Sequence, residues 1–119
     1  MFKDARIKYR NMKIMSIFGT RPEIIRLSKI FQLIDKNYEH VMINTNQNFT
    51  YELNQVFFSD LGLRKPDYNL KVKTGEYGLA AGDIIQKSEK IILKEKPDII
   101  IILGDTNSGL AAIPAAHHG

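Results

Sequence analysis

Short apolar runs alternate along the chain with longer segments whose apolar residues recur every three or four positions. Runs of the first kind are typical of buried strands in a parallel sheet, and segments of the second kind are typical of helices that cover such a sheet. The expected strands are Met12–Phe18, His40–Thr45 and Asp98–Leu103, with a short extended piece at Pro66–Leu70. The expected helices begin after Gly19, span Tyr51–Leu61 and Glu76–Lys96, and run from the turn after Leu103 toward His117.

This order of elements predicts an α/β fold in which a doubly wound parallel sheet is connected by right-handed crossovers. Five consecutive apolar residues from Ile99 predict that the strand Asp98–Leu103 is buried on both faces. Ligands of such sheets bind at the carboxyl ends of the strands. Two turns are expected at that edge, namely Gly19–Glu23 and Gly104–Ser108.

The first of these turns combines a helix start with a cation. Thr20 is suited to cap the helix, Pro22 is tolerated in its first turn, and Glu23 is favoured near its positive end. Arg21 would stand beside backbone N–H groups that favour an anion. The turn lacks both the Gly-Lys-Ser/Thr of a Walker loop and the three glycines of a dinucleotide fingerprint. Two interpretations remain: Arg21 binds a ligand phosphate or carboxylate, or the turn is an ordinary surface helix start.

The other polar positions are also open to two interpretations. Asp105 directly follows the apolar run from Ile99, where an acid either faces the ligand crevice or caps the next helix. The loop Asn46-Gln47-Asn48 is by itself an ordinary polar turn. His117 and His118 are neighbours in the last expected helix and point about 100° apart, so we expect exposed side chains and no metal pair.

Composition supports one ordinary globular unit and excludes several classes of protein. The chain has 119 residues, of which 44% are hydrophobic and 25% are charged. It contains no cysteine, which excludes a disulfide framework, a thiolate nucleophile and a cysteine-based metal site and fits a reducing cytoplasm. No apolar run approaches the ~20 residues that a membrane-spanning helix needs.

The net charge of +4 is concentrated at the amino terminus. Residues 1–11 hold four basic and one acidic side chain, a local charge of +3, which leaves residues 12–119 with +1. We interpret residues 1–11 as a solvated basic extension, because no apolar segment of a signal peptide is present there. The nearly neutral remainder, without a basic helix or an aromatic platform, argues against nucleic-acid binding.

Both turns also carry a family signature. Met-Lys-Ile-Met-Ser-Ile-Phe-Gly-Thr-Arg-Pro-Glu from Met12, with Gly-Asp-Thr-Asn-Ser from Gly104, closely resembles the non-hydrolysing UDP-N-acetylglucosamine 2-epimerase family. Thr-Asn-Gln-Asn-Phe from Thr45 and Phe-Phe-Ser-Asp-Leu-Gly-Leu from Phe57 are similar to it as well, so the resemblance covers residues 12–119. The variant Arg-Pro-Glu-Ile-Ile-Arg-Leu-Ser resembles the branch that makes UDP-N-acetyl-L-fucosamine.

The resemblance implies that residues 12–119 are part of the Rossmann-like N-terminal domain of a GT-B architecture, in which two such domains hold a nucleotide sugar between them. It implies a cytoplasmic isomerase of polysaccharide biosynthesis that inverts C2 of a UDP-N-acetyl sugar by eliminating and re-adding UDP. The family pattern continues with a second acidic region and a second domain, so we expect this chain alone to be inactive. The alternatives are a non-catalytic truncated or split-gene remnant acting with a complementary chain, or another GT-B nucleotide-sugar enzyme.

Residue roles also follow from the resemblance. It makes Asp105 the catalytic acid/base or an orienting group, and it makes Arg21 part of the site for the anionic substrate. Arg26 occupies a position where many members have lysine, and it replaces a compact ammonium by a planar fork. Gln47 matches a substrate-binding loop in which Asn46 replaces the usual glycine. The resemblance implies neither a metal nor a cofactor, and family members are often homodimers.

Overall fold

The computed structural model describes residues 12–45, 51–73, 75–103 and 107–119. Four strands and four α-helices alternate in this part of the chain, together with one 3₁₀ helix. The strands are β1 (Lys13–Phe18), β2 (Glu39–Asn44), β3 (Tyr68–Asn69) and β4 (Ile99–Ile102). The helices are α2 (Arg21–Asn37), α3 (Tyr51–Asp60), α4 (Tyr77–Glu95), the 3₁₀ helix η1 (Asn107–Ala111) and α5 (Ala112–His118). Each predicted element is present, with ends shifted by a few residues at most.

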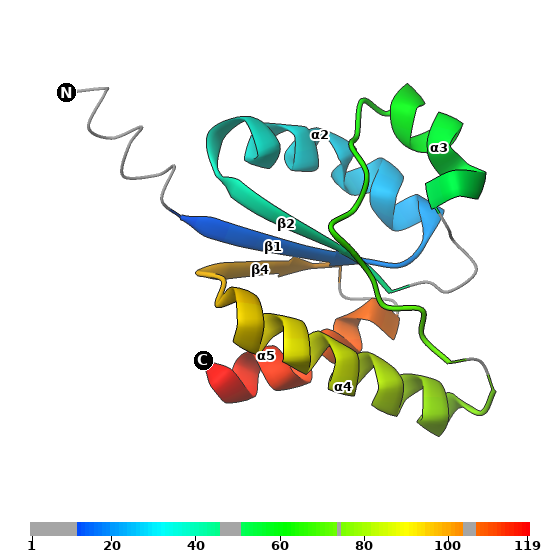
Figure 1. Cartoon of the computed structure of the whole chain (residues 1–119), viewed down its shortest axis with the longest axis vertical. Helices are drawn as coiled ribbons and strands as arrows, with labels where there is room; N and C mark the ends of the chain where they lie inside the picture. Colours follow the sequence, from blue (N-terminus) through cyan, green and yellow to red (C-terminus); the bar gives the residue numbers. More distant parts are fainter. Residues whose placement is uncertain (1–11, 46–50, 74, 104–106) are drawn as a thin grey trace.

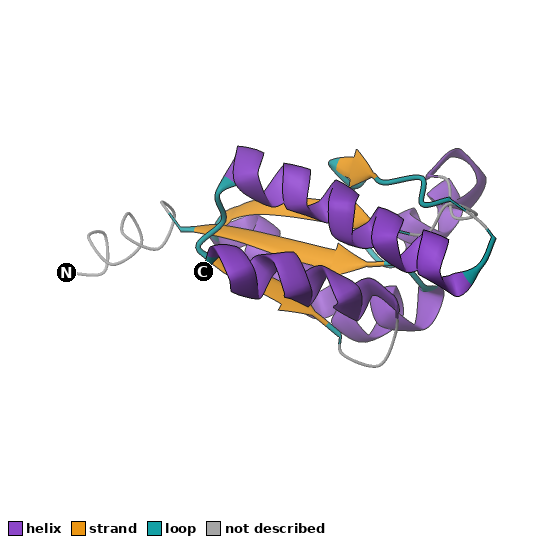
Figure 2. Cartoon of the chain, turned by 90° about the horizontal axis from the view of Figure 1, so that it is seen from below, coloured by secondary structure: helices purple, strands orange, loops and turns teal. Residues whose placement is uncertain are grey.

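The strands form one parallel sheet in the order β3-β2-β1-β4. Helices α2 and α3 lie on one face of the sheet, and α4 and α5 lie on the other (Figures 1 and 2). The central strand β1 is paired on both sides, so that Met15 is aligned with Val41 of β2 and with Ile100 of β4. The predicted doubly wound parallel sheet is therefore confirmed.

Side chains of β1 and β2 alternate between two apolar cores. Met15 and Ile17 pack with α4, whereas Phe18 packs with α2 and α3. The core on the α4 side consists of Met15, Ile17, Val41, Ile43, Leu70, Val72, Ile84, Ile91, Ile92 and Ala111. The core on the α2 side consists of Phe18, Ile24, Leu27, Phe31, Met42, Phe58 and Leu63. Because successive strand residues point to opposite faces, one buried strand supplies both cores.

Strand β4 differs from its prediction. Ile99 is 44% exposed and the other three residues of β4 are part-exposed, so the expected burial on both faces is wrong. The physical reason is its place at the edge of the sheet, where its only strand neighbour is β1 within the described part of the chain. An apolar run indicates a strand that suits a buried position, but it does not determine how many neighbours the strand has.

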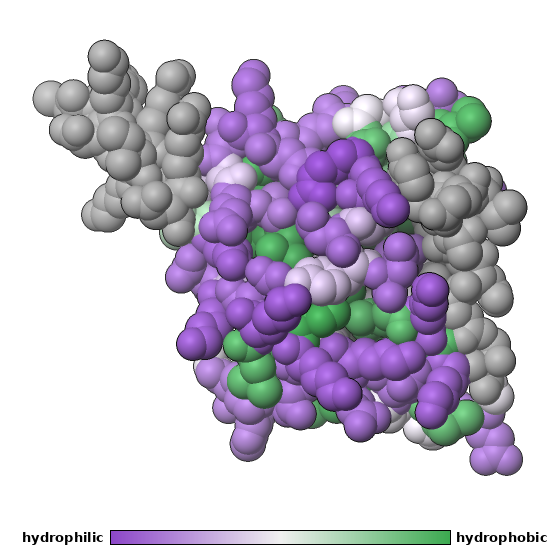
Figure 3. Space-filling view, viewed as in Figure 1, coloured by the Kyte–Doolittle hydropathy of each residue, from purple (hydrophilic) through white to green (hydrophobic). Residues whose placement is uncertain are grey.

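The outer surface is mostly polar. On the face shown in Figure 3, hydrophilic residues cover most of the molecule and apolar residues show in small, separate groups. Among the described helices, none is both long enough and apolar enough to cross a membrane.

A chain of polar groups runs from the buried α2 side of the sheet to the surface. Ser16, which is fully buried in β1, places its Oγ 2.8 Å from Nε2 of His40. His40 Nδ1 lies 3.0 Å from Oδ1 of Asp35, and Arg64 donates to that oxygen and to the carbonyl of His40. Although this order of groups is that of a serine hydrolase triad, the Ser16 hydroxyl is enclosed and cannot meet a substrate. The network is structural.

Burial determines the charge of His40 in this network. The side chain is only 1% exposed, and the loss of hydration lowers its pKa below the ordinary value of 6.5, against the opposing pull of Asp35. A neutral ring fits the two contacts, because Nδ1–H donates to Asp35 while Nε2 accepts from the Ser16 hydroxyl.

We predict that this buried histidine destabilises the fold in mild acid. Its pKa is lower in the folded than in the unfolded chain, so the unfolded chain binds the proton more readily, and the free energy of unfolding falls as pH drops below 6.5. One proton contributes a slope of at most about 1.4 kcal/mol per pH unit. Urea unfolding followed by circular dichroism between pH 8 and 5 measures this slope.

The chain has three histidines, which provides a matched control. Replacing both exposed residues, His117→Asn and His118→Asn, should leave the slope near pH 6 in place, whereas His40→Gln should flatten it. An unchanged slope in His40→Gln would assign the acid sensitivity to other groups.

Candidate functional site

The turn after β1 is fixed by two reciprocal hydrogen bonds. Thr20 caps α2, and its Oγ1 accepts from the backbone N–H of Glu23 at 3.4 Å. Glu23 turns back and accepts the N–H of Gly19 through Oε2 at 2.8 Å. This carboxylate is 1% exposed, so the turn is held by a buried charged group. The arrangement is a variant of the capping box, with the glutamate at the third helical position.

Arg21 is the first residue of α2 and extends from this turn. Its side chain is exposed, and its guanidinium carbon lies 5.3 Å from the centre of the Phe57 ring in α3. Phe57 itself is part-buried against the α2-side core. The carboxyl edge of the sheet therefore presents a positive charge that is supported from beneath by an aromatic ring.

The ends of β1, β2 and β3 meet at the same edge. Thr45, just after β2, donates its backbone N–H to the carbonyl of Phe18 at 2.8 Å. The buried amide of Asn44 donates to Oδ1 of Asn69 in β3 at 3.1 Å. These contacts tie the carboxyl ends of the three strands together at the edge where the Gly19–Arg21 turn begins.

The structure describes two of the four predicted site residues, Arg21 and Arg26. Arg21 lies at the carboxyl edge as expected. Arg26 is exposed on the same helix, about 7.5 Å further along the axis and about 140° around it, so the two side chains leave α2 on different sides. Gln47 and Asp105 lie outside the described residues. They follow β2 and β4, the two strands that flank β1.

Two contributors were missed by the sequence interpretation. Glu23 was assigned only to the favourable end of the helix dipole, although the Thr-x-x-Glu spacing from Thr20 is itself the signal of a capping box. Phe57 gave no local signal, because it is 36 positions beyond Arg21 and only the tertiary fold brings the two together.

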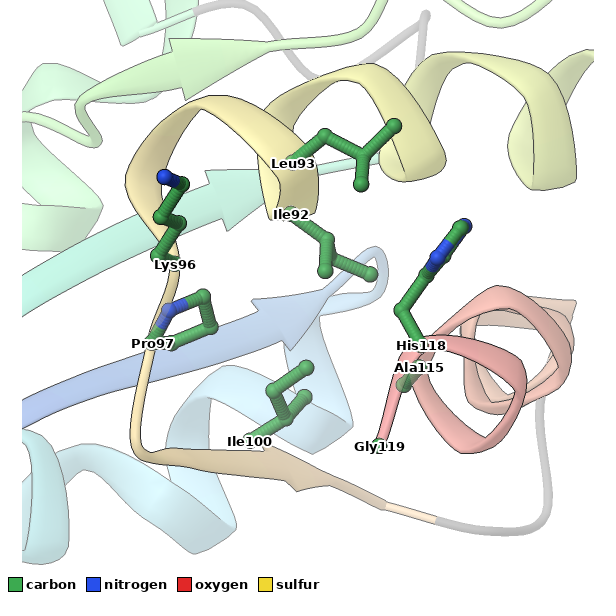
Figure 4. A pocket seen from close by; sticks show the side chains of 8 residues that line it. All are labelled: Ile92, Leu93, Lys96, Pro97, Ile100, Ala115, His118 and Gly119. Carbon is green, nitrogen blue, oxygen red and sulfur yellow. The ribbon is translucent and has the colours of Figure 1, made fainter.

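A cavity of about 220 Å³ lies elsewhere, between the end of α4, the start of β4 and α5 (Figure 4). Ile92, Leu93, Pro97 and Ile100 form much of its wall, and His118 points across it toward α4. Because Pro97 precedes β4 and Ile100 is its second residue, this cavity is at the opposite end of that strand from the predicted ligand edge. The cavity is therefore separate from the Arg21 turn.

The two histidines of α5 match their prediction in part. Both are exposed, and their rings meet edge to face with centroids 5.0 Å apart. His118 also contacts Glu89 at 2.9 Å, a partner that was not expected. Within the described ranges, no cluster of three or more histidine or acidic side chains is arranged to hold a metal ion.

Pro114 is accommodated because the last helix is divided. The 3₁₀ helix η1 ends at Ala111 and α5 begins at Ala112, which places Pro114 in the first turn of α5. Backbone N–H groups in that turn have no acceptor within the helix, so the missing proline N–H costs no intrahelical hydrogen bond.

Comparison with known proteins gives a consistent result. Residues 32–119 match the family model described as UDP-N-acetylglucosamine 2-epimerase. The UDP-N-acetylglucosamine 2-epimerase of Methanocaldococcus jannaschii is 44% identical over 101 residues, 84% of this chain and 28% of that protein. The UDP-2,3-diacetamido-2,3-dideoxy-D-glucuronate 2-epimerase of Pseudomonas aeruginosa is 38% identical over 107 residues, 88% of this chain and 30% of that protein.

Solved structures agree in fold as well as in sequence. The UDP-N-acetylglucosamine 2-epimerase of Rickettsia bellii superposes with a TM-score of 0.82 at 46% identity, covering 91% of this chain and 29% of that one. The M. jannaschii enzyme in complex with UDP-GlcNAc and UDP gives 0.80 at 40% identity, covering 90% and 30%. The α/β fold is thus that of a known class of sugar-nucleotide epimerase. The chain belongs to the UDP-N-acetylglucosamine 2-epimerase family, and it spans less than a third of the length of these relatives.

We predict that Glu23 is necessary for the stability of the turn that carries Arg21. Glu23→Ala should lower the free energy of unfolding by about 1–3 kcal/mol, because the Gly19 N–H loses a buried acceptor. Glu23→Gln retains an acceptor oxygen within reach and should cost less. Urea unfolding of the two variants measures the difference, and equal losses would contradict a role for the Gly19 contact.

Proposed function

We propose that residues 12–119 form part of the N-terminal, substrate-binding domain of an isomerase that inverts C2 of a UDP-N-acetyl sugar. The observation that carries this proposal is the capped turn with Arg21 at the carboxyl edge of the sheet, in a fold that matches the M. jannaschii epimerase in complex with UDP-GlcNAc and UDP. A cation beside a helix N-terminus is suited to a diphosphate.

The proposed reaction removes the proton from C2 and breaks the C1–oxygen bond, which gives a glycal and free UDP. Re-addition of UDP to C1, with proton return to the opposite face of C2, gives the epimer. In this scheme Asp105 is the acid/base or orienting group at C2, and Arg21 stabilises the departing diphosphate. Arg26 and Gln47 bind the substrate, the former through a guanidinium fork at a position where the family resemblance implies lysine in many members.

We also propose that the active enzyme extends beyond β4. The half-exposed isoleucines of β4 support this, because the doubly wound order 3-2-1-4-5-6 places a fifth strand beside the fourth. The missing elements, including a second domain of a GT-B architecture, would come from further polypeptide, either in one chain or as a complementary chain. The alternative is a non-catalytic remnant. A homodimer, a cytoplasmic location, a role in polysaccharide synthesis and the UDP-N-acetyl-L-fucosamine branch belong to the same proposal.

The 119-residue chain by itself should not turn over substrate. Acid/base groups that lack the second domain's hold on uridine and diphosphate lose both positioning and leaving-group stabilisation. Incubation with UDP-GlcNAc, followed by chromatography for UDP-ManNAc and for free UDP, tests this. Formation of either product well above a protein-free blank would show that the chain suffices.

Asp105 is tested in a chimera that joins residues 12–119 to the remainder of the R. bellii epimerase, which is 46% identical over the shared region. Asp105→Ala should lower kcat by a factor of about 10²–10⁴, the usual contribution of a general acid or base. Asp105→Asn can still cap a helix but cannot exchange the proton, so it should be equally impaired. Full activity of Asp105→Asn would make Asp105 a helix cap and would contradict its catalytic role.

A further inference from the structure

We infer that Phe57 is a positioning residue, which holds the Arg21 guanidinium at the carboxyl edge of the sheet for an anionic ligand of the diphosphate class. This inference rests on the proposed function, because it takes Arg21 as a ligand-binding residue. It adds a residue of α3 to a site otherwise described through the turn after β1. The evidence is that Phe58, Phe57 and Arg21 pack against one another in that order, from the core to the guanidinium.

The first step is the anchoring of Phe57 to the core. The neighbouring ring of Phe58 is fully buried in the α2-side core, and the two rings meet edge to face at 6.0 Å between centroids. Phe57 packs against the same core and is part-buried. Its ring therefore has little freedom to move away from the base of the site.

The second step is the contact with the cation. The Arg21 guanidinium carbon lies over the Phe57 ring at 5.3 Å from its centre, within the range of a cation–π interaction. The guanidinium has five N–H donors, and the Phe57 ring has no lone pair that would compete with a phosphate for them. The contact thus restricts where the arginine points without itself providing a hydrogen-bond acceptor.

The third step is the fixed origin of the Arg21 side chain. Its backbone follows Thr20 directly, and the turn is held by the buried carboxylate of Glu23. With the backbone held from one side and the guanidinium from the other, the long side chain is arranged before a ligand arrives. An arginine ordered in advance loses less conformational entropy on binding, which raises affinity.

The test is NMR spectroscopy of the 119-residue chain, with UDP as the probe. The Nε–Hε signal of Arg21, assigned by its loss in Arg21→Lys, should be shifted upfield by the ring current of Phe57. Phe57→Leu should remove that shift and weaken UDP binding about threefold to tenfold, the range expected for one partly exposed cation–π contact. Phe57→Tyr retains a ring and should restore both.

Each other outcome contradicts a definite part of the proposal. A wild-type Arg21 signal without an upfield shift would overturn the contact, and unchanged UDP affinity in Phe57→Leu would overturn the positioning role. A normal ring-current shift with no response to millimolar UDP would overturn ligand binding by Arg21, the part of the proposed function on which this inference rests, and would reduce the Phe57 contact to a structural one. Methyl signals of the core confirm the fold of each variant, and Phe57→Met replaces Phe57→Leu if the latter unfolds.

Discussion

The fold depends on the burial of β1 on both faces. Every residue from Ile14 to Phe18 is buried, and both edges of the strand are paired with parallel neighbours. Parallel neighbours require crossover connections, and two buried faces require a helical layer on each side. Because the strands are parallel, their carboxyl ends lie at one edge of the sheet. The location of the proposed ligand-binding edge is therefore a consequence of how the central strand is buried and paired.

The middle and the carboxyl end of β1 are held by different physical means. In the middle of the strand, the Ser16 hydroxyl is enclosed, and without a partner it would cost about 1–3 kcal/mol. His40 removes that cost, and Asp35 and Arg64 fix the ring in turn. At the carboxyl end a buried carboxylate holds the turn instead. Buried polar contacts therefore hold β1 at both places, so that the exposed Arg21 extends from a firmly supported backbone, as a binding site requires.

Local sequence patterns were sufficient to predict the helices and strands, but they did not predict which of these elements pack against one another. The spacing of Ile24, Leu27 and Phe31 is that of one helix face, and each of the three is buried in α2. The position of Thr20 directly before the expected helix also identified it as the N-cap. The contact of Phe57 with Arg21 was not accessible in this way, since it depends on how α3 packs, and no alternation or spacing encodes the distance between two helices.

Comparison of β2 and β4 shows that an apolar sequence predicts a strand but does not determine how deeply that strand is buried. Both flank β1, but Val41 and Ile43 of β2 are buried while Ile99 of β4 is 44% exposed. The difference is the neighbour on the outer side, because β3 pairs with β2. Four consecutive isoleucines are suited to a strand covered on both faces, and their partial exposure supports a sheet that continues beyond β4 in the active enzyme. Asp105 follows this strand, so the proposed catalytic position depends on the elements that would support β4. The Arg21 turn, in contrast, is supported within the described fold itself, so that the proposed ligand-binding position does not depend on elements beyond β4.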